Sequence, residues 1–532
     1  MNFIQRLSVL FSIWIFIPHV VHGQSQDHNY IKTTSLLIPI TDPNQIENIE
    51  DGEKIDVIQY YDGLGRLVQT NNYHASPSFS DIIQHIEYDS LGRQRYDFLP
   101  FPVEADGSYR SSTRDLVMEY YDSPTDITIP ATLYPFGEKE FDNSPLNRVM
   151  KQGFPGDSWQ LDAHPQRFEY FSNSWNDHVF LFNYSESTHQ FSTNGYYSEH
   201  TLFVNKTYDE NGNLIRTFRD KSDKIILKED SLSGIQHRTY YIYDLYDNLS
   251  VVIQPEGSSQ ITGSFTSTAP FIHLWCFTYT YDNRNRLTEK HIPGMNEPVC
   301  MVYDSLDRLI LTQDGNLALS NLYDHQWYFT KYDALGRPIL EGLYRNRTDT
   351  TREDLREVAD DYFFPHSYYE TRTGVQYSTQ QGYTDNAFPP MDSCEILKVF
   401  YYDDYDFDSD GQDDFTYNPF SGFGDQDLLE HPRGMPTGTK SKILLEPILQ
   451  DPFLFTVSFY DRKSRIIQQQ LRNHSGHLDT LATRYNFAGD ILYTRYSFAS
   501  AYDYHVICDS LVYDHARRLK ETHKKTDGQA WF

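Results

Sequence analysis

The sequence predicts an all-β fold, an extended antiparallel β-sheet built as a strip of successive hairpins. Three observations lead to this prediction: a Tyr-Asp turn motif that recurs along the chain, alternating strands in front of the motif, and the composition. The 532 residues include 42 Tyr, 28 Gly and 25 Pro. Tyr is favoured in strands and can bury its ring while its hydroxyl reaches water or a polar partner.

The repeated unit is an aromatic-rich strand, Tyr-Asp, two or three turn residues that often include Gly or Asn, and then Arg with an apolar residue. The clearest copies begin at Tyr61, Tyr88, Tyr208, Tyr243, Tyr281, Tyr303 and Tyr332, and more divergent copies begin at Tyr460, Tyr485 and Tyr513. A single copy indicates only a turn. Copies that recur along most of the chain indicate a repeat architecture.

Each unit has the properties of a β-hairpin. In Phe277–Tyr281, aromatic residues alternate with threonines, as in a half-buried strand. The Asp can accept hydrogen bonds from following backbone N–H groups and begin the turn. A later turn residue needs a positive φ, which Gly provides and Asn tolerates. The residues expected there are Gly65, Gly92, Gly212, Gly336, Gly489 and Asn285. A cross-strand pair adds only roughly 0.2–1 kcal/mol, so stability must come from many stacked hairpins.

The N-terminus is typical of a secretory signal peptide, assigned to residues 1–23. Arg6 precedes an apolar run from Leu7 to Val21, and the small residues Val21 and Gly23 precede a cut before Gln24. The alternative is a single membrane anchor, although a run of about 15 residues is short for a bilayer span. We therefore expect an exported protein, extracellular or at the cell surface, or periplasmic.

The formal net charge of −30 disfavours nucleic acid as a partner, because it repels phosphate backbones. No further apolar run approaches membrane length, so we expect no transmembrane helix after signal cleavage. The four cysteines, Cys276, Cys300, Cys394 and Cys508, form no C-x-x-C pair. Cys276 and Cys300 lie on strands two apart in the predicted meander, too distant for a disulfide, so we expect free, buried thiols.

The sequence resembles bacterial Rhs/YD-repeat proteins, in particular long Gram-negative members with an N-terminal domain of unknown function. Three stretches carry the resemblance: 62–70 with 87–93 and 99–102, 141–149 leading to 153–159, and 329–338. The resemblance implies a β-sheet strip that curls into a hollow shell. In relatives the shell encloses a C-terminal toxin, which a core motif cleaves free.

The units suggest a division of the mature chain. Residues 24–165 form a leader domain with two YD units, and residues 166–345 carry a YD-repeat sheet in which Gly257–Thr268 is an exposed loop. Residues 346–455 contain no YD unit and are an insertion or an irregular part of the strip, and residues 456–532 resume the repeats. Within the leader, Asn143–Arg148 is too polar for a core strand, and Pro145 excludes a central one. We expect an ordered loop there that clamps the leader to the strip.

Standard catalytic signatures such as G-x-S-x-G, H-E-x-x-H and the phosphate-binding G-x-x-x-x-G-K are absent from the sequence, so we expect no enzyme and no obligatory cofactor. One acidic stretch fits a calcium loop: Asp406, Asp408, Asp410 and Asp414 match positions 1, 3, 5 and 9. Position 12, where a bidentate Glu belongs, is Tyr417. The alternative is a solvated acidic loop.

The sequence favours a structural shell or secretion scaffold of the toxin-encapsulating or cell-surface Rhs type. The alternative is an extracellular adhesin or carbohydrate-binding protein, which rows of exposed Trp and Tyr in a groove would favour. We recognise no core motif or toxin-like tail. We therefore expect an open, curved sheet whose partner is a downstream core and toxin segment, or a second copy that pairs with the open sheet edges.

Overall fold

The structure is a computed structural model. It describes residues 28–528, apart from 37–39, 41–44, 47–48, 50–52, 77, 127, 233–234, 319–325, 346–350, 364–365, 375–380, 421–427, 445–451, 500–502 and 516. The predicted signal peptide, residues 1–23, lies outside this part of the chain.

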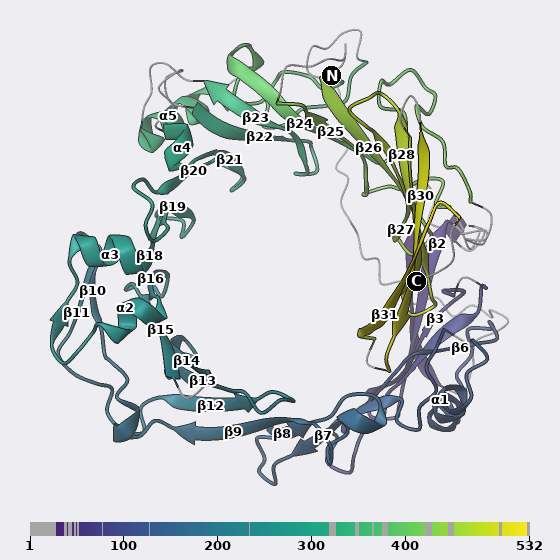
Figure 1. Ribbon diagram of the computed structural model, residues 1–532, viewed down its shortest axis with the longest axis horizontal. Coiled ribbons are helices and arrows are strands. Elements are labelled where there is room, and N and C mark those ends of the chain that lie inside the picture. Colours follow the sequence, from purple (N-terminus) through teal and green to yellow (C-terminus); the bar gives the residue numbers. More distant parts are fainter. Residues whose placement is uncertain are drawn as a thin grey trace, which may run out of the picture.

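The protein is a ring whose wall is one long antiparallel sheet, as the repeated hairpins predict (Figure 1). In ring order the strands are β5 (Tyr96–Phe98), β7 (Phe136–Phe141), β8 (Val149–Gln152), β9 (Gln166–Ser172), β12 (Phe203–Tyr208), β13 (Leu214–Arg219), β14 (Ile225–Leu232), β15 (Ile235–Tyr243), β16 (Leu249–Ile253), β18 (Cys276–Tyr281), β19 (Leu287–His291), β20 (Val299–Tyr303), β21 (Leu309–Gln313), β22 (Gln326–Tyr332), β23 (Pro338–Arg345), β24 (Cys394–Tyr402), β25 (Pro436–Lys442), β26 (Phe453–Tyr460), β27 (Ile466–Arg472), β28 (Leu478–Tyr485), β29 (Ile491–Ala499), β30 (Tyr504–Tyr513) and β31 (Leu519–Thr526). The all-β prediction is confirmed.

Two smaller sheets and several short helices lie beside this wall. The leader contributes a five-stranded sheet of β1 (Asn29–Leu36), β2 (Lys54–Tyr61), β3 (Leu67–Asn72), β4 (Asp81–His85) and β6 (Phe101–Val103). A three-stranded sheet contains β10 (Asn183–Ser185), β11 (Gln190–Thr193) and β17 (Phe265–Thr266). The helices are α1 (Thr113–Asp122), α2 (Pro255–Ser259), α3 (Ala269–Trp275), α4 (Gly315–Ala318) and α5 (Arg352–Phe363), with 3-10 turns η2 (Asp157–Trp159), η3 (Trp175–Asp177) and η5 (Met391–Ser393).

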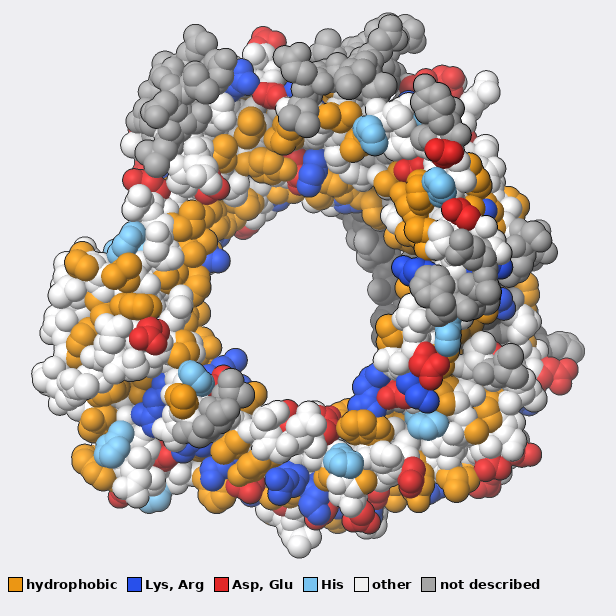
Figure 2. Space-filling model, viewed as in Figure 1, with side chains coloured by type: hydrophobic (Ala, Val, Ile, Leu, Met, Phe, Trp, Pro, Cys, Tyr) orange, Lys and Arg blue, Asp and Glu red, His pale blue; other side chains and the backbone are white. Residues whose placement is uncertain are grey.

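The two faces of the wall differ. Helices α2, α3 and α5 lie on its outer side (Figure 1), where they cover hydrophobic clusters that include Val251, Cys276, Phe329 and Leu355. Because successive side chains of a strand point to opposite faces, the alternate residues line the inner face. Figure 2 shows that the side chains leave the centre of the ring open.

Aromatic residues occur along the inner face. Val251 and Ile253, both buried in an outer cluster, pair with Thr278 and Cys276, which places Phe277 and Tyr279 on the inner side. Lys290 reaches over the Phe277 ring at 5.9 Å. The predicted alternation of aromatic and threonine faces in β18 is therefore confirmed, and the aromatic face is the inner one.

Two local expectations need correction. The predicted exposed loop at Gly257–Thr268 contains the end of α2 and all of β17. Gly257 is buried, and Trp275 packs so closely on it that a Cβ there would lie 2.5 Å from the Trp275 side chain. Asn143–Arg148 is the turn that joins β7 to β8 within the wall, rather than a separate clamp. Residues 346–455 fit the second of the two predicted interpretations, an irregular part of the strip, because they contribute β24 and β25 to the wall, with α5 and an excursion after Tyr402 on its outer side.

The expected open sheet is wrong, because the strand order forms a closed circuit. The leader meets the turns of the last hairpins: Phe487 belongs to the leader's hydrophobic cluster, where its ring centroid lies 6.0 Å from that of Tyr120. Edges that would recruit another copy are thus brought together within one chain. The sequence pattern does not contain this contact, since it joins residues more than 300 positions apart.

Candidate functional site: the interlocked turns of the ring

The repeated Asp is the centre of each turn. In the unit of Asp304, one carboxylate oxygen accepts hydrogen bonds from the backbone N–H groups of Leu306 and Arg308, both at 2.9 Å. The other oxygen accepts the Nε–H of Arg308 at 2.8 Å. The backbone N–H of Asp304 donates to the carbonyl of Arg308 at 2.9 Å. One side chain therefore closes the turn and fixes the Arg that follows it.

The turn geometry repeats along the chain. A register shift comes directly before the Tyr, for example between Val302 and Tyr303 or Lys331 and Tyr332, as expected for a turn that ends in a β-bulge. The bulge residue has positive φ, +77° at Gly336 and +58° at Asn285, which confirms the predicted requirement. Asp307 and Ser464 occupy the same position with φ of 64° and 62°. The predicted position is therefore correct, although Asp and Ser occupy it as well as Gly and Asn.

Each turn also binds the next one. The Arg guanidinium carbon lies over the Tyr ring of the following hairpin, at 4.9 Å for Arg308 on Tyr332 and 4.4 Å for Arg337 on Tyr402. That Tyr donates its hydroxyl back to the carbonyl of the residue after the Arg, as Tyr332 does to Leu309 at 2.6 Å. The same back-donation occurs from Tyr88, Tyr170, Tyr303, Tyr402 and Tyr485. It also occurs from Tyr243, Tyr281 and Tyr460, whose acceptors follow Lys224, Asn248 and Met435 instead of an Arg.

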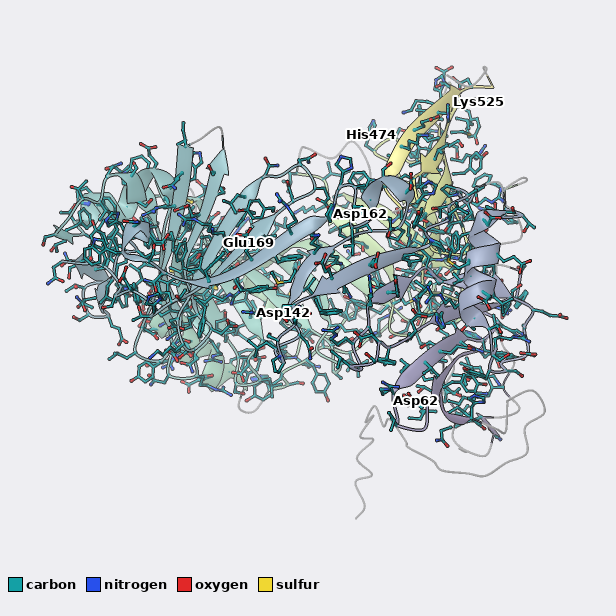
Figure 3. All side chains as sticks on the ribbon, turned by 90° about the horizontal axis from the view of Figure 1, so that it is seen from below. Asp62, Asp142, Asp162, Glu169, His474 and Lys525 are labelled. Atoms are coloured by element: carbon teal, nitrogen blue, oxygen red, sulfur yellow. The ribbon has the colours of Figure 1, made fainter. Side chains whose placement is uncertain are left out.

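Because antiparallel strands alternate in direction, turns after every second strand lie on the same rim of the ring. The turns beginning at Asp142, Asp220, Asp244, Asp282, Asp304, Asp333, Asp403, Asp461, Asn486 and Asp514 therefore share one rim, which we call the turn rim. In the edge-on view, Asp142 lies toward the lower rim, opposite to His474 and Lys525 (Figure 3). The turn rim is thus a row of hydrogen-bonded turns, many with an Asp-held Arg, and Lys224, Asn248 and Asp490 take the place of the Arg in three of them.

The electrostatics follow from these bonds. The pKa of Asp62 is lowered by the backbone N–H of Arg66 and by its guanidinium, and the pKa of Asp209 is lowered by the side chain and backbone of Asn213. For Arg337, burial lowers the pKa, but its bonds to Asp403 and Asp333 outweigh burial and raise the pKa overall. The carboxylates of Asp62 and Asp209 are thus stabilised as anions.

Two units depart from the sequence motif. Asp142 accepts the backbone and Nε of Arg148, six residues on, and Arg148 stacks on Tyr170 at 5.0 Å, so the polar 143–148 segment is an enlarged repeat turn. Asp403 accepts both terminal nitrogens of Arg337 and the backbone N–H of Gly434. These units were missed because the residues that close the turn are not at the motif's spacing.

The acidic loop brings together three of its four predicted ligands. Carboxylate oxygens of Asp406, Asp408 and Asp414 lie within 4.8 Å of one another, whereas Asp410 is outside the cluster. Asp406 accepts the backbone N–H of Gly411 at 2.9 Å. Partial desolvation, followed by the charge of Asp414, raises the pKa of Asp408.

Position 12 of this loop supplies no ligand. Tyr417 packs against the outer hydrophobic cluster, with its ring centroid 5.9 Å from that of Phe459. Three carboxylates fit the oxygen preference of calcium but are fewer than the six to eight oxygens it takes. The calcium loop and the solvated acidic loop both remain open as interpretations.

A pocket of about 390 Å³ in the leader contains a hydroxyl–imidazole–carboxylate chain. Thr113 Oγ1 lies 2.7 Å from His85 Nδ1, and His85 Nε2 lies 3.2 Å from Glu87. Burial lowers the pKa of His85. Thr113 is only 4% exposed, so its hydroxyl is poorly placed to attack a substrate. The chain holds the start of α1 against β4.

The cysteines and helices agree with part of the expectation. All four cysteines are free, but only Cys276 is buried, and the other three are partly exposed. Within the described part of the chain, none of the helices has the length and apolar character needed to cross a membrane.

One part of the chain matches a known family model. Residues 32–172 match the model of the family described as "Domain of unknown function (DUF6443)". No curated protein matches. Among solved structures, the chain is similar to TcdB2-TccC3 at 12% identity and a TM-score of 0.41, over 89% of this chain and 21% of that chain. It is also similar to TcdB2-TccC3 without the hypervariable C-terminal region, at 12% identity and a TM-score of 0.39, over 94% and 21% of the two chains. This chain thus spans about a fifth of the length of these structures.

Proposed function

We propose that this protein is a non-catalytic, exported wall section of a hollow Rhs-type shell. The observation that carries the proposal is the closed sheet with an open centre. The wall commits its repeated Asp, Arg and Tyr side chains to one another, so the most conspicuous polar groups of the repeat serve structure. The buried Thr113 and the paired charges beside it support a non-catalytic role.

Electron microscopy of the purified full-length chain tests this role. We expect ring-shaped particles with a stain-filled centre. Compact particles without a central opening would refute the proposal. A reporter that is active only outside the cytoplasm, fused after residue 23, tests export, with deletion of Leu7–Val21 as the control.

The finer part of the proposal concerns the contents of the ring. By its resemblance to Rhs/YD-repeat proteins, we propose that a downstream core and toxin segment occupies or closes the shell. The coding sequence beyond Phe532 tests this part directly. Co-expression of such a segment with the full-length chain should protect the segment from added protease, and digestion equal to that of the segment alone would refute this part.

The alternative role as a carbohydrate-binding surface rests on exposed aromatics. Among the tryptophans that the structure describes, only Trp175 is exposed, at 57%, and it has edge contacts with Tyr196 and His178. A row of exposed rings in a groove is not formed there. A glycan array with wild type and Trp175→Ala distinguishes the two roles, and loss of glycan binding in the variant would favour the adhesin.

A further inference from the structure

We infer that the leader domain is the clasp that closes the ring, and that its Trp159 takes the place of a repeat tyrosine. This inference gives a role to the domain of unknown function matched over residues 32–172. It rests on the proposed function as a hollow wall. The surface on the leader, here called the clasp surface, consists of Phe79, Tyr120, Gly156 and Trp159.

Arg518 stacks on the leader as the other repeat arginines stack on the next hairpin. Along the turn rim each Arg stacks on the Tyr of the next hairpin, at distances such as 4.6 Å for Arg465 on Tyr485. Arg518 belongs to the last repeat unit that the structure describes, and its guanidinium carbon lies 3.6 Å from the Trp159 ring centroid. Like the other repeat arginines, Arg518 is held by its own Asp, with its Nε 2.8 Å from Asp514. The leader therefore presents an aromatic ring where the repeat would present its next Tyr.

Neighbouring turns also fit closely against the clasp surface. A Cβ on Gly156 would lie 3.0 Å from a ring carbon of His515, and Gly156 also has a φ of +98°, so only glycine suits this close approach. Arg462 lies over the Phe79 ring at 5.4 Å. Phe487 inserts beside Tyr120 in the leader's cluster. The turns after β26, β28 and β30 thus all meet the leader.

The contacts between the leader and the last hairpins are of three kinds. Side chains make these closing contacts, namely one cation stacked on an indole, one on a phenyl ring, and one inserted phenyl. Because β31 and β5 are adjacent in the closed strand order, these contacts reinforce that junction, and their loss favours its opening. A partly desolvated cation–π contact contributes enough free energy to change the open-to-closed ratio roughly tenfold.

The test counts open and closed particles of the full-length chain by electron microscopy, in urea at which a small share of wild-type rings is open. We expect Trp159→Ala and Arg518→Ala each to raise the open-to-closed ratio about tenfold. Trp159→Tyr should keep the ring closed, because a tyrosine performs the same role for Arg308, Arg337 and Arg465. Dimers formed by two opened chains count as open.

Two matched controls separate the clasp from general loss of stability. Trp175→Ala removes an exposed tryptophan away from the clasp, and Arg308→Ala removes a stacked Arg within the wall; neither should open the ring. An unchanged ratio in both Trp159→Ala and Arg518→Ala, or opening by Trp159→Tyr equal to that of the alanine variant, overturns the inference. The wild-type images decide the proposed function separately, because hollow rings that stay closed in all variants would leave the shell role standing and reject the clasp.

Discussion

Replacement of Asp304 by alanine should destabilise the wall more than the same replacement at an exposed repeat Asp such as Asp209. The Asp304 side chain is 0% exposed and that of Arg308 is 15% exposed, so the pair is largely desolvated. Alanine leaves two backbone N–H groups and a buried guanidinium without their acceptor. Loss of one partner from such a pair costs about 3–5 kcal/mol. If the chain unfolds as a unit, its unfolding entropy is roughly 1 kcal/mol per kelvin, and Tm should fall by about 3–5 °C.

Asp209→Ala is the matched control. Asp209 makes the same bonds, to the backbone N–H groups of Asn211 and Asn213 and to the Asn213 amide, but its partner is neutral and the turn is exposed. Its loss should cost about 1 kcal/mol and a correspondingly small change in Tm. Calorimetry of the full-length variants at neutral pH measures both. Equal shifts would show that burial and charge pairing do not determine the strength of the turn, and the reasoning would fail.

Further measurements test the turns and the acidic loop. Gly336→Val should cost roughly 1–3 kcal/mol because its φ is +77°, whereas Gly63→Val, in equally open space without a positive φ, should change Tm little; equal effects would contradict the turn assignment. The lowered pKa values of Asp62 and Asp209 mean that their stabilisation is complete well above pH 3.8 and is lost as the pH falls below it, so a Tm that stays constant down to pH 3 would refute this contribution. Calcium titrated into the wild type should release binding heat that Asp408→Ala abolishes and Asp410→Ala retains, and absence of heat in the wild type rejects the site. Limited proteolysis should spare 143–148, because Arg148 anchors this turn; rapid cleavage there would contradict its order.

The sequence predicted the repeat because its bonds are local. Asp304, Leu306 and Arg308 lie within five residues, so their spacing contains the whole turn. The Asp403 unit was missed because Gly434, which replaces the usual N–H donor, is 31 residues away. The buried Lys331 was also unforeseen: it lies in a repeat strand, and its partners Glu370 and Asp385 come from a distant segment.

Closure was the main feature that the sequence could not provide. Curvature of a sheet accumulates from small rotations between neighbouring strands, and no single unit specifies the total. Arg518 reads as an ordinary repeat residue, and Trp159 lies in a segment without a repeat. Only the folded ring shows that these two residues meet.

The excursion after Asp403 has a practical consequence for engineering. Asp403 accepts hydrogen bonds from Arg337 and from Gly434, although the chain leaves the sheet for some thirty residues between Asp403 and Gly434. Closing a longer loop adds little entropic cost, since each doubling of length costs only about 0.6 kcal/mol. The exposed pair Gly411 and Gln412 is therefore a suitable junction for grafting a foreign domain whose termini are adjacent. Such a graft would be displayed on the outside of the wall while the strands on either side keep their register.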